Sequence, residues 1–306
     1  DKLVYYGFFM SIISVINFLS FYFYCKIKFT NCMKVSKTYD HRLFKDMLKF
    51  SGWMILDPIA FSINGQGVNM LLNSFFGTLV NTAFGIANQV GQAIDSFCMN
   101  LSTAFRPQMI QSYSTGNIGR SLRLFSSMSK FCFILFLLIC IPIVFNIKYI
   151  YTIWLGNSFP PITIPISIIF IFVKLVGCLN HPISYIIMAK GNLKRYMLVT
   201  SIITSSIIPL SFIFLRFGCS VEVVFVSMLF ISVINQIASI IVLSREIPEY
   251  SPKDYCKTIL WPCIELSLLL VFSVAAIHRL LCNDTLRLVF DFIVSGIITL
   301  SGSYLF

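Results

Sequence analysis

The 306 residues are 57% hydrophobic and only 11% charged, and they carry a net charge of +11. Ordinary soluble domains are about 45–50% apolar and about 25% charged, so this composition excludes a soluble globular protein. The apolar residues form long runs, and a membrane-spanning helix needs about 20 of them. We therefore predict an all-α, polytopic integral membrane protein, since runs of this length are too long for barrel strands.

Nine apolar runs are long enough to span a bilayer. They cover residues 4–25, 51–74, 79–104, 125–146, 164–188, 197–216, 222–244, 259–281 and 286–306. If the spans alternate in direction, 17 of the 23 basic residues fall in connections on one side, which the positive-inside rule places in the cytoplasm. These connections are residues 26–49, 106–130, 189–196 and 245–258. Because the charge is divided among separate loops, it does not indicate nucleic-acid binding.

The predicted organisation has four parts. They are a single span at 1–25, a basic cytoplasmic linker at 26–50, six spans at 51–246 and two additional spans at 247–306. The second half of the linker has amphipathic helical spacing, so we expect it to lie along the membrane surface. Because the chain starts at Asp1 directly before a span, we expect a carboxy-terminal fragment.

Glycines and prolines predict the irregular segments. Pro107, Gly116 and Gly119 predict a loop between the third and fourth spans. Prolines within or near the later spans predict kinks, because proline has no N–H to donate. These prolines are Pro142, Pro165, Pro182 and Pro209.

Amides concentrate in the second and third spans. The second carries one stripe at helical spacing, with Asn64 and Asp57 on the opposite side; the stripe is Gln66, Asn69 and Asn73. The third carries a longer stripe of Asn81, Asn88, Gln92 and Asp95. Such groups either join helices by hydrogen bonds or line a polar cavity. Seven polar groups in two successive stripes exceed what helix packing needs, which favours a cavity.

Few ionisable groups fall inside the spans. Lys174 is expected to pair with a carboxylate such as Asp95 or to bind an anionic group such as a diphosphate, and Arg106 is the second candidate for either role. Asp57 and Asp95 are the candidates for ion coupling. Because Asp57 precedes Pro58, it either marks an interrupted helix or lies near the interface.

The other ionisable groups and the cysteines do not indicate a catalytic or metal site. Glu265 and Asp291 either take part in proton coupling or pair with each other. The ten cysteines contain no CxxC pair, so we predict no metal site, no disulfide framework and no cofactor. Catalytic motifs are missing, and the protein is not predicted to be an enzyme.

Three segments resemble a known family. They are GWMILDPIAFSINGQGVNMLLNSFFGTLVNTAFGIANQVGQAIDSF, RPQMIQSYS and YTIWLG. This pattern, over about residues 50–245, resembles the bacterial polysaccharide (O-antigen type) flippases, the Wzx-like branch of the MATE-like (MOP) superfamily. The resemblance implies two helical lobes around a central cavity and alternating access. The chain would supply nine of fourteen spans, namely the last span of the first lobe, the second lobe and two extra helices.

The resemblance also implies a substrate. It is an undecaprenyl diphosphate-linked oligosaccharide, moved across the bacterial inner membrane for surface polysaccharide or lipopolysaccharide biosynthesis. H⁺ or Na⁺ is the expected coupling ion, and membrane lipids are the other partners. A MATE-type multidrug or cation antiporter is the alternative, supported by Asp57 and Asp95. A membrane-bound polysaccharide polymerase or acyltransferase is disfavoured, because it needs a large periplasmic loop with paired Arg or His.

Overall fold

The computed structural model describes residues 2–30, 40–156, 158–281 and 283–305. The side chains of Lys2, Leu3, Asp57 and residues 303–305 lie outside this description. The chain divides into two units, Asp1–Lys49 and Phe50–Phe306. The first contains α1 (Lys2–Lys28) and the beginning of α2 (His41–Phe76), and the second contains the rest of α2 and all later helices.

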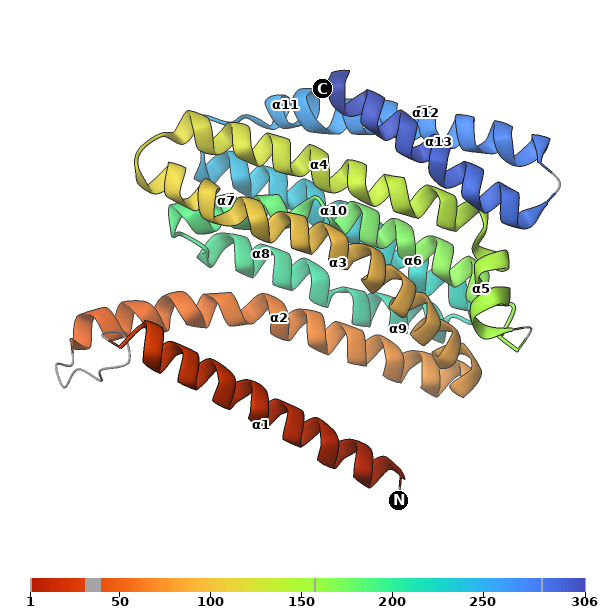
Figure 1. Ribbon diagram of the computed structural model, residues 1–306, viewed down its shortest axis with the longest axis horizontal. Helices are drawn as coiled ribbons and strands as arrows, with labels where there is room; N and C mark the ends of the chain where they lie inside the picture. Colours follow the sequence, from red (N-terminus) through yellow and green to blue (C-terminus); the bar gives the residue numbers. More distant parts are fainter. Residues whose placement is uncertain (1, 31–39, 157, 282, 306) are drawn as a thin grey trace. The chain divides into compact units, whose positions relative to one another are not determined.

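Every element in the described part of the second unit is a helix (Figure 1). After α2 the helices are α3 (Thr78–Ser114), α4 (Ile118–Phe145), α5 (Ile147–Leu155), α6 (Thr163–Gly177), α7 (Asn180–Lys190), α8 (Lys194–Ser205), α9 (Ile207–Arg216), α10 (Val221–Glu246), α11 (Pro252–Tyr255), the π-helix η1 (Cys256–Leu260), α12 (Trp261–Leu280) and α13 (Asp284–Leu305).

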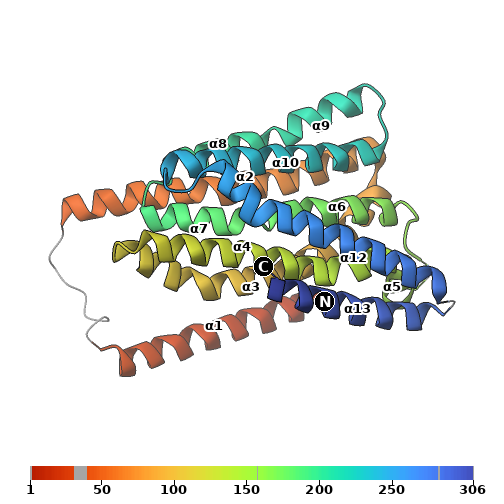
Figure 2. The ribbon, with the colours of Figure 1, turned by 90° about the horizontal axis from the view of Figure 1, so that it is seen from above.

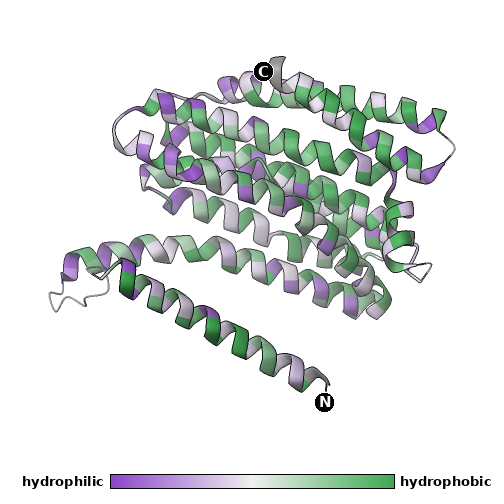
Figure 3. Cartoon of the chain, viewed as in Figure 1, coloured by the Kyte–Doolittle hydropathy of each residue, from purple (hydrophilic) through white to green (hydrophobic). Residues whose placement is uncertain are grey.

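Seven segments among the described residues are helical, long and apolar enough to cross a membrane. They are Val4–Lys28, Ile118–Phe145, Thr163–Lys190, Lys194–Arg216, Val221–Glu246, Pro252–Leu280 and Asp284–Gly302. The chain is therefore an all-α, multi-pass membrane protein, and apolar residues dominate these helices (Figure 3). The expected spans at 51–74 and 79–104 lie in α2 and α3, which fall short of this apolar composition because amides interrupt both.

The long helices of the second unit run roughly along one direction (Figures 1 and 2). α3 packs against α4, α6 and α7, and α10 packs against α6, α8 and α9. The hairpin of α12 and α13 packs against α4. α3 and α10 thus flank α6 and α7, and this arrangement positions the candidate site.

Two spans are interrupted, between α6 and α7 and between α8 and α9. Pro182 has no N–H, so the carbonyl of Cys178, four residues earlier, lacks its helical donor. Pro209 has the same effect on the carbonyl four residues before it. The expected irregularity is confirmed at both positions. Pro142 instead lies inside a continuous α4, and Pro165 lies in the first turn of α6, where no helical donor is needed.

The prediction of a loop over residues 106–130 is wrong. α3 continues through Pro107, and only residues 115–117 separate it from α4. Gly116 permits this tight turn with a φ of 80°, and the side chain of Asn117 caps α4 by accepting a hydrogen bond from the Arg120 amide at 3.1 Å. A three-residue turn therefore connects the two helices where a long loop was expected.

α2 is also more regular than expected. Pro58 lies inside it without an interruption, and the amphipathic end of the linker, from His41, forms its first turns rather than a separate helix. One missing hydrogen bond does not end the helix, because the neighbouring backbone groups still satisfy one another. Its buried positions follow one stripe, Ala60, Asn64, Val68 and Leu72.

An apolar core closes the bundle around α3, α6 and α10. The ring of Phe84 lies 5.4 Å from that of Phe170 and 5.3 Å from that of Phe225. Leu72 and Val80, on either side of the α2–α3 turn, belong to the same core. This core closes the α2–α3 end of the site.

Candidate functional site

A cavity of about 370 Å³ lies among α2, α3, α6, α7, α8, α9 and α10. Its size falls within the range of small-molecule pockets, about 300–1,000 Å³. Seven amide side chains line it, from α2, α3, α7 and α10: Asn64, Gln66, Asn69, Asn88, Gln92, Asn180 and Asn235. Lys174 is the only charged residue among the described residues that line it. The cavity therefore combines apolar surface with many amide groups and a single charge.

Lys174 takes part in a cluster of three ionisable groups. Its ammonium lies 3.5 Å from Oδ2 of Asp95, and Nε2 of His181 lies 3.4 Å from Oδ1 of the same carboxylate. The Lys174 side chain is only 13% exposed, and its ammonium lies 5.4 Å and 5.7 Å from the ring centres of Phe61 and Phe170. A lysine buried this far needs a counter-charge, which Asp95 provides. The ion pair with Asp95, one of the two roles expected for Lys174, is present.

Helix spacing brings these groups together. Asn88, Gln92 and Asp95 follow one another at four and three residues along α3, so they share a face. Between them, Gly91 allows close approach of α6, since a Cβ at this position would lie 3.0 Å from the ring of Phe170. Asp95 can therefore reach Lys174 on α6.

Both interrupted spans reach the cavity. Asn180 is the first residue of α7, and Thr204 and Ile207 flank the break between α8 and α9. Broken helices at a polar cavity are typical of transporter binding sites, because irregular backbone is tolerated where it lines a cavity.

Several lining amides keep unused acceptors. Oδ1 of Asn64, Asn180 and Asn235 is buried and has no hydrogen-bond partner among the described residues. Buried polar groups are nearly always paired, so such atoms call for water or a ligand. Amides both donate and accept, and they suit a ligand rich in hydroxyl groups.

Four of the predicted amides line the cavity, namely Gln66, Asn69, Asn88 and Gln92. Asn73 and Asn81 do not, because they lie beside the α2–α3 turn, where Leu72 and Val80 pack in the core. Asp95 reaches the cavity through Lys174.

The sequence placed Asn64 on the wrong side of α2. Asn64 is 5% exposed and lines the cavity, whereas Gln66 lies at its exposed edge. Apolar packing sets this rotation, since Val68 and Leu72 turn the Asn64 face inward. Gly67 also approaches α9 so closely that a Cβ would lie 2.5 Å from Cδ1 of Ile208.

Sequence reasoning missed three further groups. These groups are Asn180, His181 and Asn235. Each is a polar residue inside an apolar span, and such residues usually face the bundle interior or a cavity, which was the only sign of their role in the sequence. They were missed because none of them belongs to a stripe of polar residues at helical spacing. Neighbouring Gln236 shows that the signal is ambiguous, since its Nε2 donates to the Tyr255 hydroxyl at 2.9 Å in the core.

Arg106 lies outside the cavity lining. Its guanidinium lies 5.1 Å from the ring centre of Tyr185, and Nη2 donates to Sδ of Met188 at 3.4 Å. Both contacts are on α7. Arg106 therefore packs between α3 and α7 rather than facing the same ligand as Lys174.

The other acidic candidates do not join the site. The side chain of Asp57 lies outside the described residues. Glu265 is exposed, and Asp291 does not pair with it. Asp291 accepts a hydrogen bond from Nδ2 of Asn146 at 2.7 Å and lies 3.6 Å from Nδ1 of His278.

The described residues contain no group of three His, Cys, Asp or Glu side chains placed to hold a metal ion. Comparison with protein-family models, with curated proteins and with solved structures finds no match.

Proposed function

We propose that the chain forms part of a flippase that carries lipid-linked oligosaccharide across the bacterial cytoplasmic membrane by alternating access, for surface polysaccharide biosynthesis. The supporting observation is the cavity lined by seven amides with Lys174 as its charged residue. Sugar hydroxyls both donate and accept hydrogen bonds, as amides do. The resemblance of residues 50–245 to the Wzx-like flippases points to the same substrate class.

The amides would bind the sugar without strong preference. Each hydrogen bond contributes only about 0.5–1.5 kcal/mol net. Several such bonds hold an oligosaccharide but still release it on the other side. The prenyl chain would stay in the lipid, because its burial in a polar cavity is unfavourable.

Lys174 would meet the diphosphate. An incoming phosphate competes with Asp95 for the ammonium, and Asp95 keeps His181 as a partner 3.4 Å away. The carboxylate is therefore not left alone when the lysine turns to the substrate. Asp95 and His181 are also the pair on which a coupling proton would act.

A cation antiporter is the second candidate, supported by Asp95 beside the cavity. In the described structure two basic side chains already contact this carboxylate. A cationic substrate would have to displace Lys174 and would then face its charge. The geometry favours the flippase for this reason.

The test is deletion of the gene in its host, with the native gene returned on a plasmid. We expect surface polysaccharide to disappear and the lipid-linked repeat unit to accumulate on the inner side, both reversed by the plasmid. Normal polysaccharide in a clean deletion would contradict the flippase. Drug resistance lost in the deletion, with polysaccharide intact, would favour the antiporter.

A further inference from the structure

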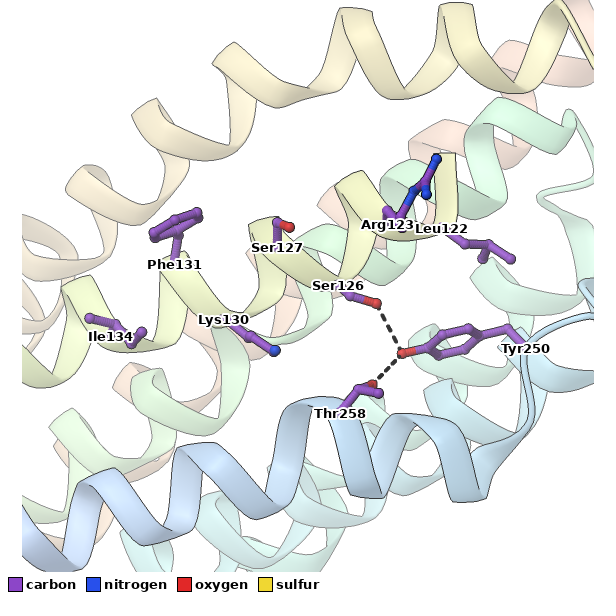
Figure 4. A pocket seen from close by; sticks show the side chains of 9 residues that line it. All are labelled: Leu122, Arg123, Ser126, Ser127, Lys130, Phe131, Ile134, Tyr250 and Thr258. Carbon is purple, nitrogen blue, oxygen red and sulfur yellow. Dashed lines mark hydrogen bonds between the residues drawn. The ribbon is translucent and has the colours of Figure 1, made fainter. Parts of the chain in front are cut away.

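A second pocket, of about 400 Å³, lies where the first half of α4 faces the segment that joins α10 to α12 (Figure 4). It lies at the end of the bundle where 106–130 and 245–258 meet, the end predicted to be cytoplasmic. Nothing in the proposed transport cycle uses this pocket, and none of its residues lines the amide cavity.

The wall on α4 is cationic and polar. Arg123 and Lys130 are seven residues apart, two helical turns, so both lie on the face that lines the pocket. Ser127 lies between them on the same wall and is exposed. Two cations with a hydroxyl between them form a site for a phosphate group.

The opposite wall is held by a chain of hydroxyl groups. The hydroxyl of Thr258 donates to the carbonyl of Asp254 at 2.6 Å, so it accepts from the Tyr250 hydroxyl 3.0 Å away. Tyr250 in turn accepts from Ser126 at 3.2 Å. Because each hydroxyl has one hydrogen, the chain runs in one direction from α4 to η1 (Figure 4). It fixes the two walls against each other.

The π-helix η1 places Thr258 on this wall. Pro262 has no N–H for the carbonyl of Thr258, and the amide of Trp261 bonds five residues back, to Cys256. This wider turn is a π-bulge, a feature often found at functional sites.

The polar pocket borders a shallow apolar hollow of about 10 Å³. The hollow shares Lys130 and Ile134 with the pocket and is otherwise lined by Pro262, Cys263 and Leu266, between α4 and α12. The site is therefore polar at the end of the bundle and apolar along the membrane-spanning helices. A phospholipid has the same order of groups.

We propose that this pocket binds an anionic phospholipid, with its phosphate between Arg123 and Lys130 and its acyl chains in the surrounding lipid against the exposed apolar side chains of α4 and α12. Basic pockets between spans on the cytoplasmic side attract anionic headgroups. Asp254, the acid on α11, does not line the pocket, and its carboxylate accepts hydrogen bonds from N and Oγ of Ser251 at 3.1 and 2.8 Å.

The test measures binding of phosphatidylglycerol and phosphatidylcholine to the purified full chain by native mass spectrometry. We expect phosphatidylglycerol to bind more tightly, and dihexanoyl phosphatidylglycerol to bind more weakly than the long-chain lipid. Arg123→Gln should lower the affinity for phosphatidylglycerol by about fivefold, because one cation contributes about 1 kcal/mol. Arg123→Lys should keep most of the affinity.

The matched control is Arg120→Gln, which removes the same exposed charge from the same helix outside the pocket. It should leave phosphatidylglycerol binding unchanged. Equal losses of affinity in Arg123→Gln and Arg120→Gln would overturn the proposed pocket, because they would show that any basic residue on this surface attracts the anionic lipid. Full displacement of the lipid by inorganic phosphate, or equal binding of the two lipids, would overturn the phospholipid assignment.

Discussion

Two carboxylates in the bundle lie beside a histidine, and their surroundings differ. Asp95 lies 3.4 Å from His181, its side chain is 20% exposed, and it borders the amide cavity through Lys174. Asp291, on α13, lies 3.6 Å from His278, is fully buried, and does not line the amide cavity. The comparison teaches that a buried charge alone does not mark a site. Its access to a cavity distinguishes a candidate for transport from a structural pair.

The largest effect is expected on stability, at the enclosed carboxylate. Asp291→Ala removes an acceptor of Asn146 Nδ2 and the carboxylate 3.6 Å from Nδ1 of His278, and breaking a buried charged pair costs about 3–5 kcal/mol. We expect a clearly lower midpoint of thermal unfolding in detergent.

The control on the same helix is Asp284→Ala. Its carboxylate is 59% exposed and pairs with Arg287 at 3.2 Å, so its loss should cost at most about 1 kcal/mol. If both variants unfolded at the same temperature, the structural role of Asp291 would be refuted.

The next effect concerns transport, at the carboxylate beside the cavity. Lys174→Ala and Asp95→Ala should each lower polysaccharide export by about tenfold or more, which corresponds to about 1.4 kcal/mol. The amount of protein in the membrane should stay the same, because cavity access lets water solvate the remaining partner. Polysaccharide on the cell surface and membrane protein content are the two measurements.

The double variant Asp95→Ala with Lys174→Ala separates two explanations. If the single variants fail only because one charge is left unpaired, removing both charges should restore export. If Lys174 meets the substrate, the double variant stays as defective as Lys174→Ala. We expect the second result, and recovery would exclude a substrate contact.

The smallest effect is expected at a single amide. Gln92→Leu removes one hydrogen-bonding group from the cavity and should lower export by about fivefold, which corresponds to about 1 kcal/mol. Gln89→Leu is the control, because Gln89 is exposed on α3 outside the cavity lining. Equal export in the two variants would argue against sugar binding by the α3 amides.

Some of the candidate site could be predicted from local spacing. Asn88, Gln92 and Asp95 repeat at helical intervals, so their common face followed from the sequence. The partner of Lys174 could also be inferred, since a buried ammonium needs an acid and Asp95 was available. These predictions succeeded because each depends on one helix or on one strong electrostatic requirement.

Other parts of the site could not be predicted in this way. The face that α2 turns inward depends on Val68, Leu72 and the approach of Gly67 to Ile208, which are contacts with other helices. The inward positions of Asn180 and Asn235 depend on how α7 and α10 pack. A single polar residue in an apolar span has no spacing pattern that shows which way it faces.

By itself, the sequence determined that the chain is helical and crosses a membrane several times, because long apolar runs are stable only in lipid and backbone groups there must bond within each helix. It also marked Pro182 and Pro209 as points of irregularity, because proline removes a backbone donor, although Pro142 inside the continuous α4 shows that this loss alone does not break a helix. The tertiary structure decided which amides share a cavity, why Asp95 and Asp291 differ, and that Arg123 lines the same second pocket as Tyr250 and Thr258. Those relations depend on helix rotation, which the packing of apolar side chains between helices sets and which no single helix encodes.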